Sequence, residues 1–270
     1  MPVHLAAAYE SVDQTLDNVK WNELADGEDF FTTTNSGDGL RTKGGFNRLI
    51  AAYAGSASME VARFRQVPGL ERPVLGRYIH PVSGTAEPGS PPAWMDLRGN
   101  PIDVSPDEDL NYQVKNDSAG SGEDVYGLAW FTDGQGAAIT PAAGDVVVRY
   151  TGATAGVKGN WVNVAITLDN ALEAGEYLCY GAQCIDTEVV AWRFPQAEPI
   201  GGSGNAGRWK PGGLGADAVA DLIGLESQPW WNGQLGGLVR FEHDDPPTIQ
   251  VLANGTGNSQ EGFLRLRKVA

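Results

Sequence analysis

The chain has 270 residues, of which 41% are hydrophobic and 20% charged, so it has the apolar content for a large folded core, and wholesale disorder is excluded. Its 36 Gly and 16 Pro residues indicate many short elements joined by turns. The formal net charge of −15 argues against nucleic-acid binding through a basic surface, and 3 His and 2 Cys leave little material for a zinc cage or a disulfide framework.

Alternation of apolar and polar residues predicts half-buried strands along much of the chain. In residues 161–168, Val162, Val164 and Ile166 fall on one face, and polar or small side chains fall on the other. The same period predicts three further strands, at 144–150, 248–252 and 263–269. Clusters of Gly, Pro, Asn and Ser mark turns between the strands.

The sequence predicts one or two short helices. Residues 216–223 have apolar side chains at helical spacing and are followed by Gly224, a residue typical of helix ends. Residues 12–19 fit a second helix, with Ser11 opening a capping box. The alternative for this second segment is a strand that begins near Val19.

A weak internal duplication divides the chain into two similar halves. Residues 53–64 and 180–194 both run from a Tyr through small residues to Glu-Val, then Ala, then Arg-Phe. Further along, GLAWF at 127–131 matches GLVRF at 237–241. Each half therefore carries the same two landmarks in the same order, and the connection between them is longer in the first half.

An all-β chain with two similar halves predicts two β-sandwiches or jelly rolls side by side. We place the first in residues 1–135, with a long inserted loop near 78–109, and the second in residues 136–270. Cys179 and Cys184 are five residues apart in a predicted strand, which puts them on opposite faces. Each is expected to be a free, buried thiol.

Motifs for cofactor and metal binding are weak. Residues 202–207 match GxGxxG, but Pro211 precludes the continuous helix that a dinucleotide site needs, so we interpret this segment as a loop. His243 and the two Asp residues after it are better explained as a solvated turn than as metal ligands. The sequence therefore predicts no bound cofactor and no metal site.

An acidic loop surrounds Ser105 and Pro106. It consists of Asp103, Asp107, Glu108 and Asp109. Paired carboxylates can act on a glycoside or bind calcium, but a solvated loop is the simpler interpretation. We expect no catalytic residues, and hence a protein that is not an enzyme.

Two groups of residues are candidates for interaction. Trp230 and Trp231 lie in a Gln/Pro/Gly-rich setting that predicts exposure, and they are expected to anchor a subunit interface, or alternatively to stack on sugar rings. Arg265, Arg267 and Lys268 form the one tight basic group. This group either faces phosphate, from nucleic acid or lipid, or reflects charge alternation on an edge strand.

Two β-rich halves, the absence of a catalytic motif and the loop 207–213 together resemble double jelly-roll viral major capsid proteins. The size is similar to that of the compact members found in lipid-containing, tailless icosahedral phages. The resemblance implies two eight-stranded jelly rolls standing upright in a virion shell, with homotrimers of pseudo-hexagonal outline tiling an icosahedral lattice. The chain termini, and with them Arg265, Arg267 and Lys268, would face inward.

The resemblance also implies partners and a location. The partners would be further copies of the chain, other capsid proteins such as a vertex protein, and the lipid of an internal membrane, without sequence-specific binding of nucleic acid. The virion would be assembled in the host cytoplasm. Two alternatives stay open: a β-sandwich carbohydrate-binding module or glycan-active enzyme that uses Trp230, Trp231 and the acidic loop, and a phage tail or spike component.

Overall fold

The computed structural model describes fourteen segments of the chain, which form two compact units. The described segments are residues 3–12, 22–23, 40–41, 46–56, 59–67, 77–79, 81–83, 94–103, 109–116, 123–134, 137–195, 210–216, 225–257 and 259–269. The N-terminal unit comprises the described residues from Ala6 to Asp133. The C-terminal unit comprises those from Gly134 onward together with residues 3–5.

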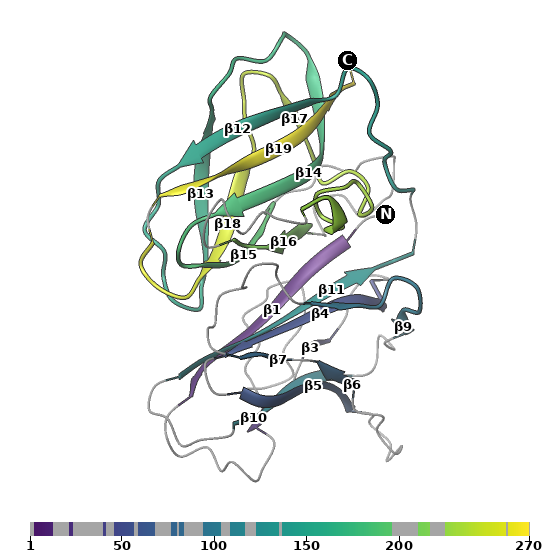
Figure 1. Cartoon of the computed structure of the whole chain (residues 1–270), viewed down its shortest axis with the longest axis vertical. Helices are drawn as coiled ribbons and strands as arrows, with labels where there is room; N and C mark the ends of the chain where they lie inside the picture. The colour runs from purple at the N-terminus through teal and green to yellow at the C-terminus, as the bar shows by residue number, and fades with distance from the viewer. Residues whose placement is uncertain are drawn as a thin grey trace. The chain divides into compact units, whose positions relative to one another are not determined.

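The described residues of the N-terminal unit form eleven strands in two sheets, and the first of these strands begins at Val3, in the short segment that belongs to the C-terminal unit (Figure 1). The strands are β1 (Val3–Val12), β2 (Asn22–Glu23), β3 (Leu40–Arg41), β4 (Arg48–Ser56), β5 (Met59–Val67), β6 (Arg77–Ile79), β7 (Pro81–Ser83), β8 (Met95–Asp96), β9 (Ile102–Asp103), β10 (Asp109–Asn116) and β11 (Glu123–Thr132). One sheet has the order β1-β11-β4-β7, with β8 and β9 also paired to β4. The other has the order β2-β10-β5-β6, with β3 also paired to β10.

The C-terminal unit is one continuous eight-stranded sheet that bends into two layers. Its strands are β12 (Val146–Gly152), β13 (Trp161–Leu168), β14 (Glu176–Ile185), β15 (Val189–Arg193), β16 (Gly212–Leu214), β17 (Val239–Glu242), β18 (Thr248–Ala253) and β19 (Gln260–Lys268). The order along the sheet is β16-β15-β18-β13-β12-β19-β14-β17. Because β14 contacts β15 and β16, and Ile185 bridges to Ala216, the two ends of the sheet lie against each other.

Both units have the same strand order. Without β3, β8 and β9, which lie off the two strand orders given above, the N-terminal unit has eight main strands, as the C-terminal unit does. When these eight strands are numbered along the chain, one layer has the order first, eighth, third, sixth in both units. The other layer has the order second, seventh, fourth, fifth. This eight-stranded arrangement of two layers is the jelly roll. The chain is a double jelly roll.

The strand order confirms the predicted all-β class and the fold that the resemblance implies. The N-terminal unit departs from its counterpart at one edge, where β7 pairs with β4 in parallel while β17 pairs with β14 antiparallel. The predicted inserted stretch 78–109 contains β8 and β9, which extend the sheet of β4.

The internal duplication is confirmed for one of its two landmarks. The described residues of 53–64 lie in β4 and β5, and residues 180–194 lie in and just after β14 and β15, which are the third and fourth strands of each unit. The second landmark was wrong. Residues 127–131 belong to β11, the eighth strand of its unit, whereas 237–241 enter β17, the sixth.

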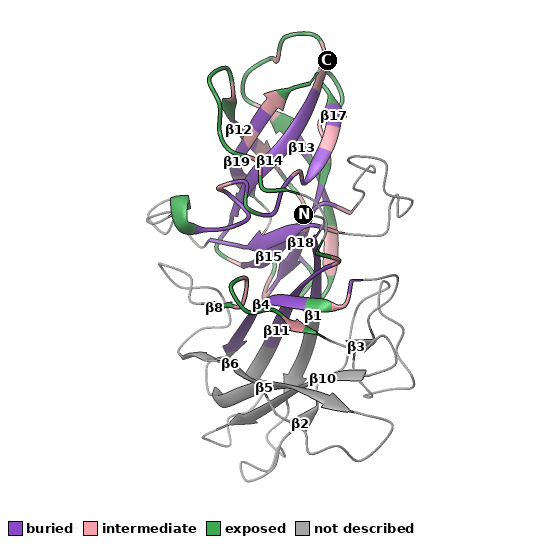
Figure 2. Ribbon diagram, turned by 90° about the vertical axis from the view of Figure 1, so that its right-hand side faces the viewer, coloured by how far each residue is buried: buried purple, intermediate pink, exposed green. Residues whose placement is uncertain are grey.

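The core of the C-terminal unit follows the predicted alternation. β13 spans the predicted residues, and Val164 and Ile166 are buried while Asn163 and Ala165 are exposed. β19 has Leu264 and Leu266 on its buried face. β14 and β15 are buried along almost their whole length, as Figure 2 shows.

The predicted helices lie largely outside the described residues. Residues 217–223 of the first are not among them, and Ala216 forms the bridge to Ile185. Of the second, only Val12 is described, as the last residue of β1. The GxGxxG segment 202–207 also falls outside. A 3₁₀ helix, η2 (Leu225–Ser227), is the one helix within the described segments, where no helix has the length and hydropathy to span a membrane.

Candidate functional site

Trp230 is a core residue of the C-terminal jelly roll, and the prediction that it is exposed was wrong. Its side chain is 0% exposed, and its indole Nε1–H donates a hydrogen bond of 3.3 Å to Gln183 Oε1 on β14. Gly213 on β16 lies so close that an added Cβ would be 2.4 Å from Trp230 Cγ. The indole is thus enclosed by β14 and β16, and it is not available to a partner subunit or a sugar.

Trp231 is also buried, at 4% exposure, and it contacts both members of a surface ion pair, Arg265 and Glu226. The guanidinium carbon of Arg265 lies 4.6 Å from the centre of its ring, and its Nε1–H donates to Glu226 Oε1 at 3.4 Å. Arg265 donates to the same carboxylate at 3.0 Å. The turn that carries both indoles is tied to β14 by a backbone hydrogen bond of 3.0 Å from Ala182 N to Trp230 O.

The three basic residues at the end of β19 each have an acidic partner. Arg265 pairs with Glu226, Arg267 with Asp145 at 2.8 Å, and Lys268 with Glu173 at 3.4 Å. Because each cation is paired with an acid, this end of β19 has little net positive potential to attract a phosphate. The alternative of charge alternation on an edge strand was wrong, because β19 lies between β12 and β14 in the interior of the sheet.

Asp145 is the centre of a polar cluster that joins three segments of the C-terminal unit. Its two carboxylate oxygens accept hydrogen bonds from Arg267 Nε and Nη2, both at 2.8 Å. Oδ2 also accepts from the Tyr180 hydroxyl at 2.8 Å and from the backbone N–H of Ala142 at 2.7 Å. These donors, the Arg267 guanidinium first, hold the pKa of the Asp145 carboxyl well below its usual range.

A β-bulge in β14 brings Tyr180 to this cluster. Cys179 lies opposite Leu266 on β19 and Gly181 lies opposite Arg265, so Tyr180 is the extra residue. The bulge changes the side-chain alternation along β14. Cys184 lies opposite Gly262, on the same face as Leu266, and therefore shares that face with Cys179.

The two cysteines are free and buried, as predicted, but the prediction that they occupy opposite faces was wrong. That prediction assumed an unbroken period of two, which the bulge at Tyr180 interrupts. Burial raises the pKa of each thiol to about 12. Thiols with such a high pKa are poor nucleophiles.

The described Trp residues do not form an open platform for sugars. Trp130 and Trp192 are buried like the pair above. Trp94 and Trp161 are partly exposed, and each carries a guanidinium over its ring, from Arg98 at 5.3 Å and from Arg193 at 3.9 Å. These two partly exposed rings are therefore covered by guanidinium groups of the protein itself.

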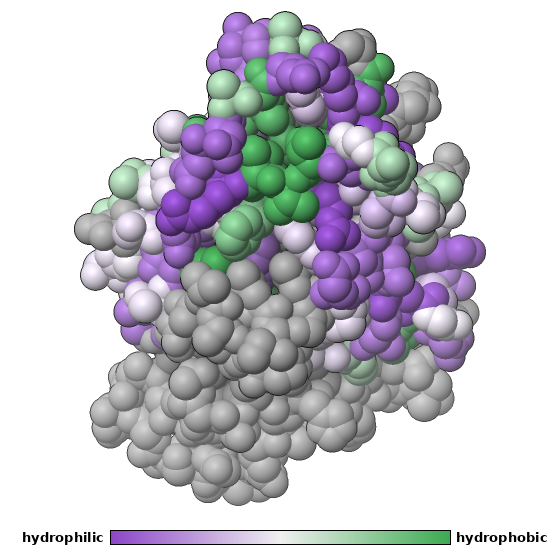
Figure 3. Space-filling view, turned by 45° about the horizontal axis from the view of Figure 1, so that its top comes forward, coloured by the Kyte–Doolittle hydropathy of each residue, from purple (hydrophilic) through white to green (hydrophobic). Residues whose placement is uncertain are grey.

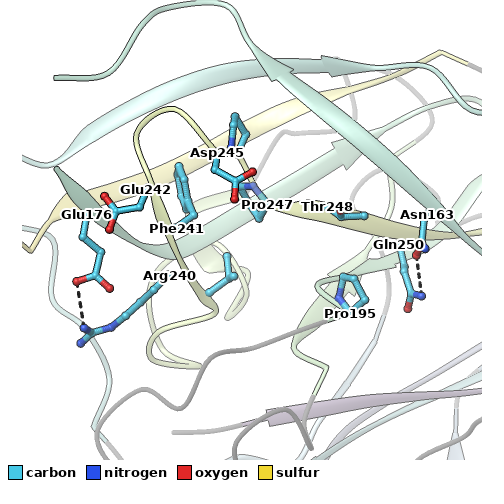
Figure 4. A pocket seen from close by; sticks show the side chains of 12 residues that line it. Asn163, Glu176, Pro195, Arg240, Phe241, Glu242, Asp245, Pro247, Thr248 and Gln250 are labelled. Carbon is cyan, nitrogen blue, oxygen red and sulfur yellow. Dashed lines mark hydrogen bonds and ion pairs between the residues drawn. The ribbon is translucent and has the colours of Figure 1, made fainter. Parts of the chain in front are cut away.

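An open hollow of about 570 Å³ lies beside β17 (Figure 4). Its lining mixes polar and apolar residues, and its charged members are Glu176, Glu242, Asp245 and Arg240. Arg240 Nη1 lies 3.5 Å from Glu176 Oε2. Phe241 is the one aromatic residue in the lining, and its side chain is buried. The hollow thus offers charged rims without an exposed ring on which a sugar would stack.

The remaining acidic candidates do not converge. In the turn after β17, His243 Nδ1 lies 3.8 Å from Asp244 Oδ1, which is a surface contact. Asp103 lies in β9 and pairs with Arg48 at 3.2 Å, whereas Asp107 and Glu108 lie outside the described residues. Within the described segments, no three His, Cys, Asp or Glu residues are grouped as metal ligands.

No protein-family model matches the chain, and no curated protein sequence matches it. Among solved structures the chain is similar to the PBSX exported protein XepA, with 8% identity, a TM-score of 0.27, and coverage of 97% of this chain and 86% of that one. It is similar to the STIV MCP with 10% identity, a TM-score of 0.24, and coverage of 98% and 97%. It is also similar to the major capsid protein P2 from bacteriophage PM2, with 8% identity, a TM-score of 0.23, and coverage of 93% and 98%.

These TM-scores are too low to carry an argument about function. The assignment of the fold rests on the strand order of the chain itself, which is the same in both units.

Sequence reasoning missed the Asp145 cluster. No local pattern marks Asp145 as special, because its main partner, Arg267, is 122 residues away in sequence. The one available signal was the position of Asp145 next to Gly144, at the start of the predicted strand 144–150, where a carboxylate often accepts backbone hydrogen bonds.

Proposed function

We propose that this chain is a structural, non-enzymatic virion protein: a major capsid subunit that assembles through homotrimers into an icosahedral shell. The observation that carries the proposal is the repetition of one jelly-roll strand order in both units of a single chain. Jelly rolls form viral capsids as well as lectin and cupin domains. Three chains with two jelly rolls each supply six such domains, which suits a trimer of pseudo-hexagonal outline.

The burial of the aromatic side chains and the pairing of the charged ones support a structural role. Four Trp side chains of the described segments are enclosed in the fold, and the cations of β19 are matched by acids. Such groups stabilise the subunit and are not presented to a small ligand. This distribution favours a coat protein over a sugar-binding module.

Apolar surface remains for contacts between subunits. Val146 and Val147 at the start of β12 are 40% and 54% exposed, and Val269 after β19 is 39% exposed. Figure 3 shows hydrophobic side chains gathered on the C-terminal unit within a hydrophilic surround. Many weak contacts of this kind, repeated around a closed ring, become strong together. The net charge of −15 keeps free subunits apart until then.

The proposal extends to partners and location. The chain would act in the virion, with its own copies as the main partner and with other capsid proteins, such as a vertex protein, at special positions. Contact with the lipid of an internal membrane belongs to the same proposal. Because Arg265, Arg267 and Lys268 are paired with acids, we do not assign that contact to them.

The native mass of the purified chain tests the proposal. Light scattering should give three times 28.7 kDa, and negative-stain images of the same peak should show six-sided particles. A monomer that neither trimerises nor assembles at high protein concentration, and that shows saturable quenching of Trp fluorescence by a polysaccharide, would overturn it in favour of a lectin-like module.

A further inference from the structure

The start of the chain is fastened into the C-terminal jelly roll at a point about two hundred residues away in sequence. The backbone N–H of Leu5 donates to Lys210 O at 3.0 Å, and the backbone N–H of Lys210 donates to the imidazole Nδ1 of His4 at 3.1 Å. Arg193 Nη1 adds a contact of 3.4 Å to Leu5 O. These three hydrogen bonds join residues 4 and 5 to Arg193 and Lys210.

His4 is enclosed and faces positive charge. The side chain is 0% exposed. The charged groups that act on it are Arg193 on β15 and Lys210 just before β16. Arg193 is itself fixed in place, because its Nε donates to Gln250 Oε1 at 2.8 Å and its guanidinium carbon lies 3.9 Å from the centre of the Trp161 ring.

The hydrogen bond from Lys210 requires a neutral imidazole. An Nδ1 atom that accepts a hydrogen bond carries no proton, so the single ring proton is on Nε2. Protonation would place a second N–H on Nδ1, directly against the backbone N–H of Lys210. It would also place a cation in an enclosed site beside Arg193 and Lys210. Desolvation, followed by the charge of these two residues, holds the pKa of His4 well below its usual value.

We propose that His4 is an acid-operated latch, whose protonation releases the start of the chain from the C-terminal jelly roll. A released His4 takes up a proton at its ordinary pKa of about 6.5. The equilibrium constant for latching therefore has its full value above that pH. Below it, the constant falls by up to about tenfold for each pH unit. The latch belongs to the folded chain and operates whether or not the chain assembles.

The test is hydrogen exchange on the purified full-length chain between pH 8 and pH 5, with intrinsic exchange rates corrected for pH. In the wild type, protection of the Leu5 N–H should fall below pH 6.5 by up to about tenfold per pH unit. In His4→Asn, the amide oxygen replaces Nδ1 as acceptor but does not titrate, so the protection should stay constant. His243→Asn, which changes a partly exposed imidazole on a surface turn, is the matched control and should behave as the wild type.

Two outcomes would overturn the latch. One is a wild-type profile that matches the profile of His4→Asn over the whole range. The other is an NMR titration in which the His4 imidazole takes up its proton while the Leu5 N–H stays protected. The titration uses the wild-type chain alone, so it decides the matter even where His4→Asn fails to fold.

Discussion

Asp145 and Arg267 are joined by two hydrogen bonds of 2.8 Å, although 122 residues separate them in sequence. The pair links the segment before β12 to the end of β19. Tyr180 on β14 and the backbone of Ala142 complete the coordination of the carboxylate. The side chain of Asp145 is 10% exposed and that of Arg267 is 32% exposed, so the pair is partly shielded from solvent. It fixes the exposed segment that precedes β12, next to the apolar residues that we propose for subunit contacts.

We expect Asp145→Asn to lower the free energy of unfolding by about 2 kcal/mol, because it leaves the Arg267 guanidinium without its charged partner in a partly shielded site. Urea unfolding followed by circular dichroism measures this change. The matched control is Asp169→Asn, which breaks the more exposed pair with Arg149 and should cost no more than about 1 kcal/mol. Equal losses in the two variants would contradict the central role of Asp145.

The same carboxylate should give the protein an acid-sensitive stability. Because the pKa of Asp145 is lowered in the folded chain, its contribution is present above its ordinary pKa of about 3.9 and is lost as the pH falls below that value. The thermal unfolding midpoint of the wild type should therefore fall more steeply between about pH 4 and about pH 2 than the midpoint of Asp145→Asn. Parallel slopes would show that the carboxylate is not held in its charged form.

Gly213 is predicted to tolerate no side chain. A Cβ at this position would lie 2.4 Å from Trp230 Cγ, so Gly213→Ala should shift the indole and cost about 2 kcal/mol of stability. Urea unfolding followed by Trp fluorescence reports both effects. Gly99→Ala, where nothing lies within 4 Å of the added carbon, is the control and should leave the unfolding midpoint unchanged. An unchanged midpoint for Gly213→Ala would contradict the close approach of β16 to Trp230.

Trp230 should matter for folding and not for ligand binding. We expect Trp230→Phe to lower the free energy of unfolding by about 2 kcal/mol, because it removes the hydrogen bond to Gln183 and part of a buried ring. Trp94→Phe, at a partly exposed position, should cost less than about 1 kcal/mol. A polysaccharide that quenches wild-type fluorescence, and fails to do so only in Trp230→Phe, would restore the sugar-binding hypothesis.

Cys179 and Cys184 should resist thiol reagents while the chain is folded. A pKa of about 12 leaves each thiol about a thousandfold less ionised at neutral pH than a free cysteine, and both side chains are buried. Ellman's reagent should therefore detect no thiol in the native protein and two thiols in urea. Reaction of either thiol without unfolding would show that solvent reaches β14.

Features that depend on neighbouring residues were predictable from the sequence. The alternation in residues 161–168 predicted β13 and its buried face, because burial of one side of a strand imposes a period of two. The Tyr-to-Phe repeat marked the third and fourth strands of both jelly rolls, since equivalent strands meet equivalent environments. These signals were enough for the fold class.

Tertiary structure decided the rest, because the deciding contacts join residues far apart in the chain. The burial of Trp230 depends on β14 and β16, and a Gln/Pro/Gly-rich setting carries no trace of them. One extra residue at Tyr180 reversed the side-chain alternation that placed the two cysteines. The basic end of β19 became a row of ion pairs only when acids from three distant segments were brought to it. Local alternation therefore determined which segments are strands, and only the packing of those strands determined which side chains remain free to act.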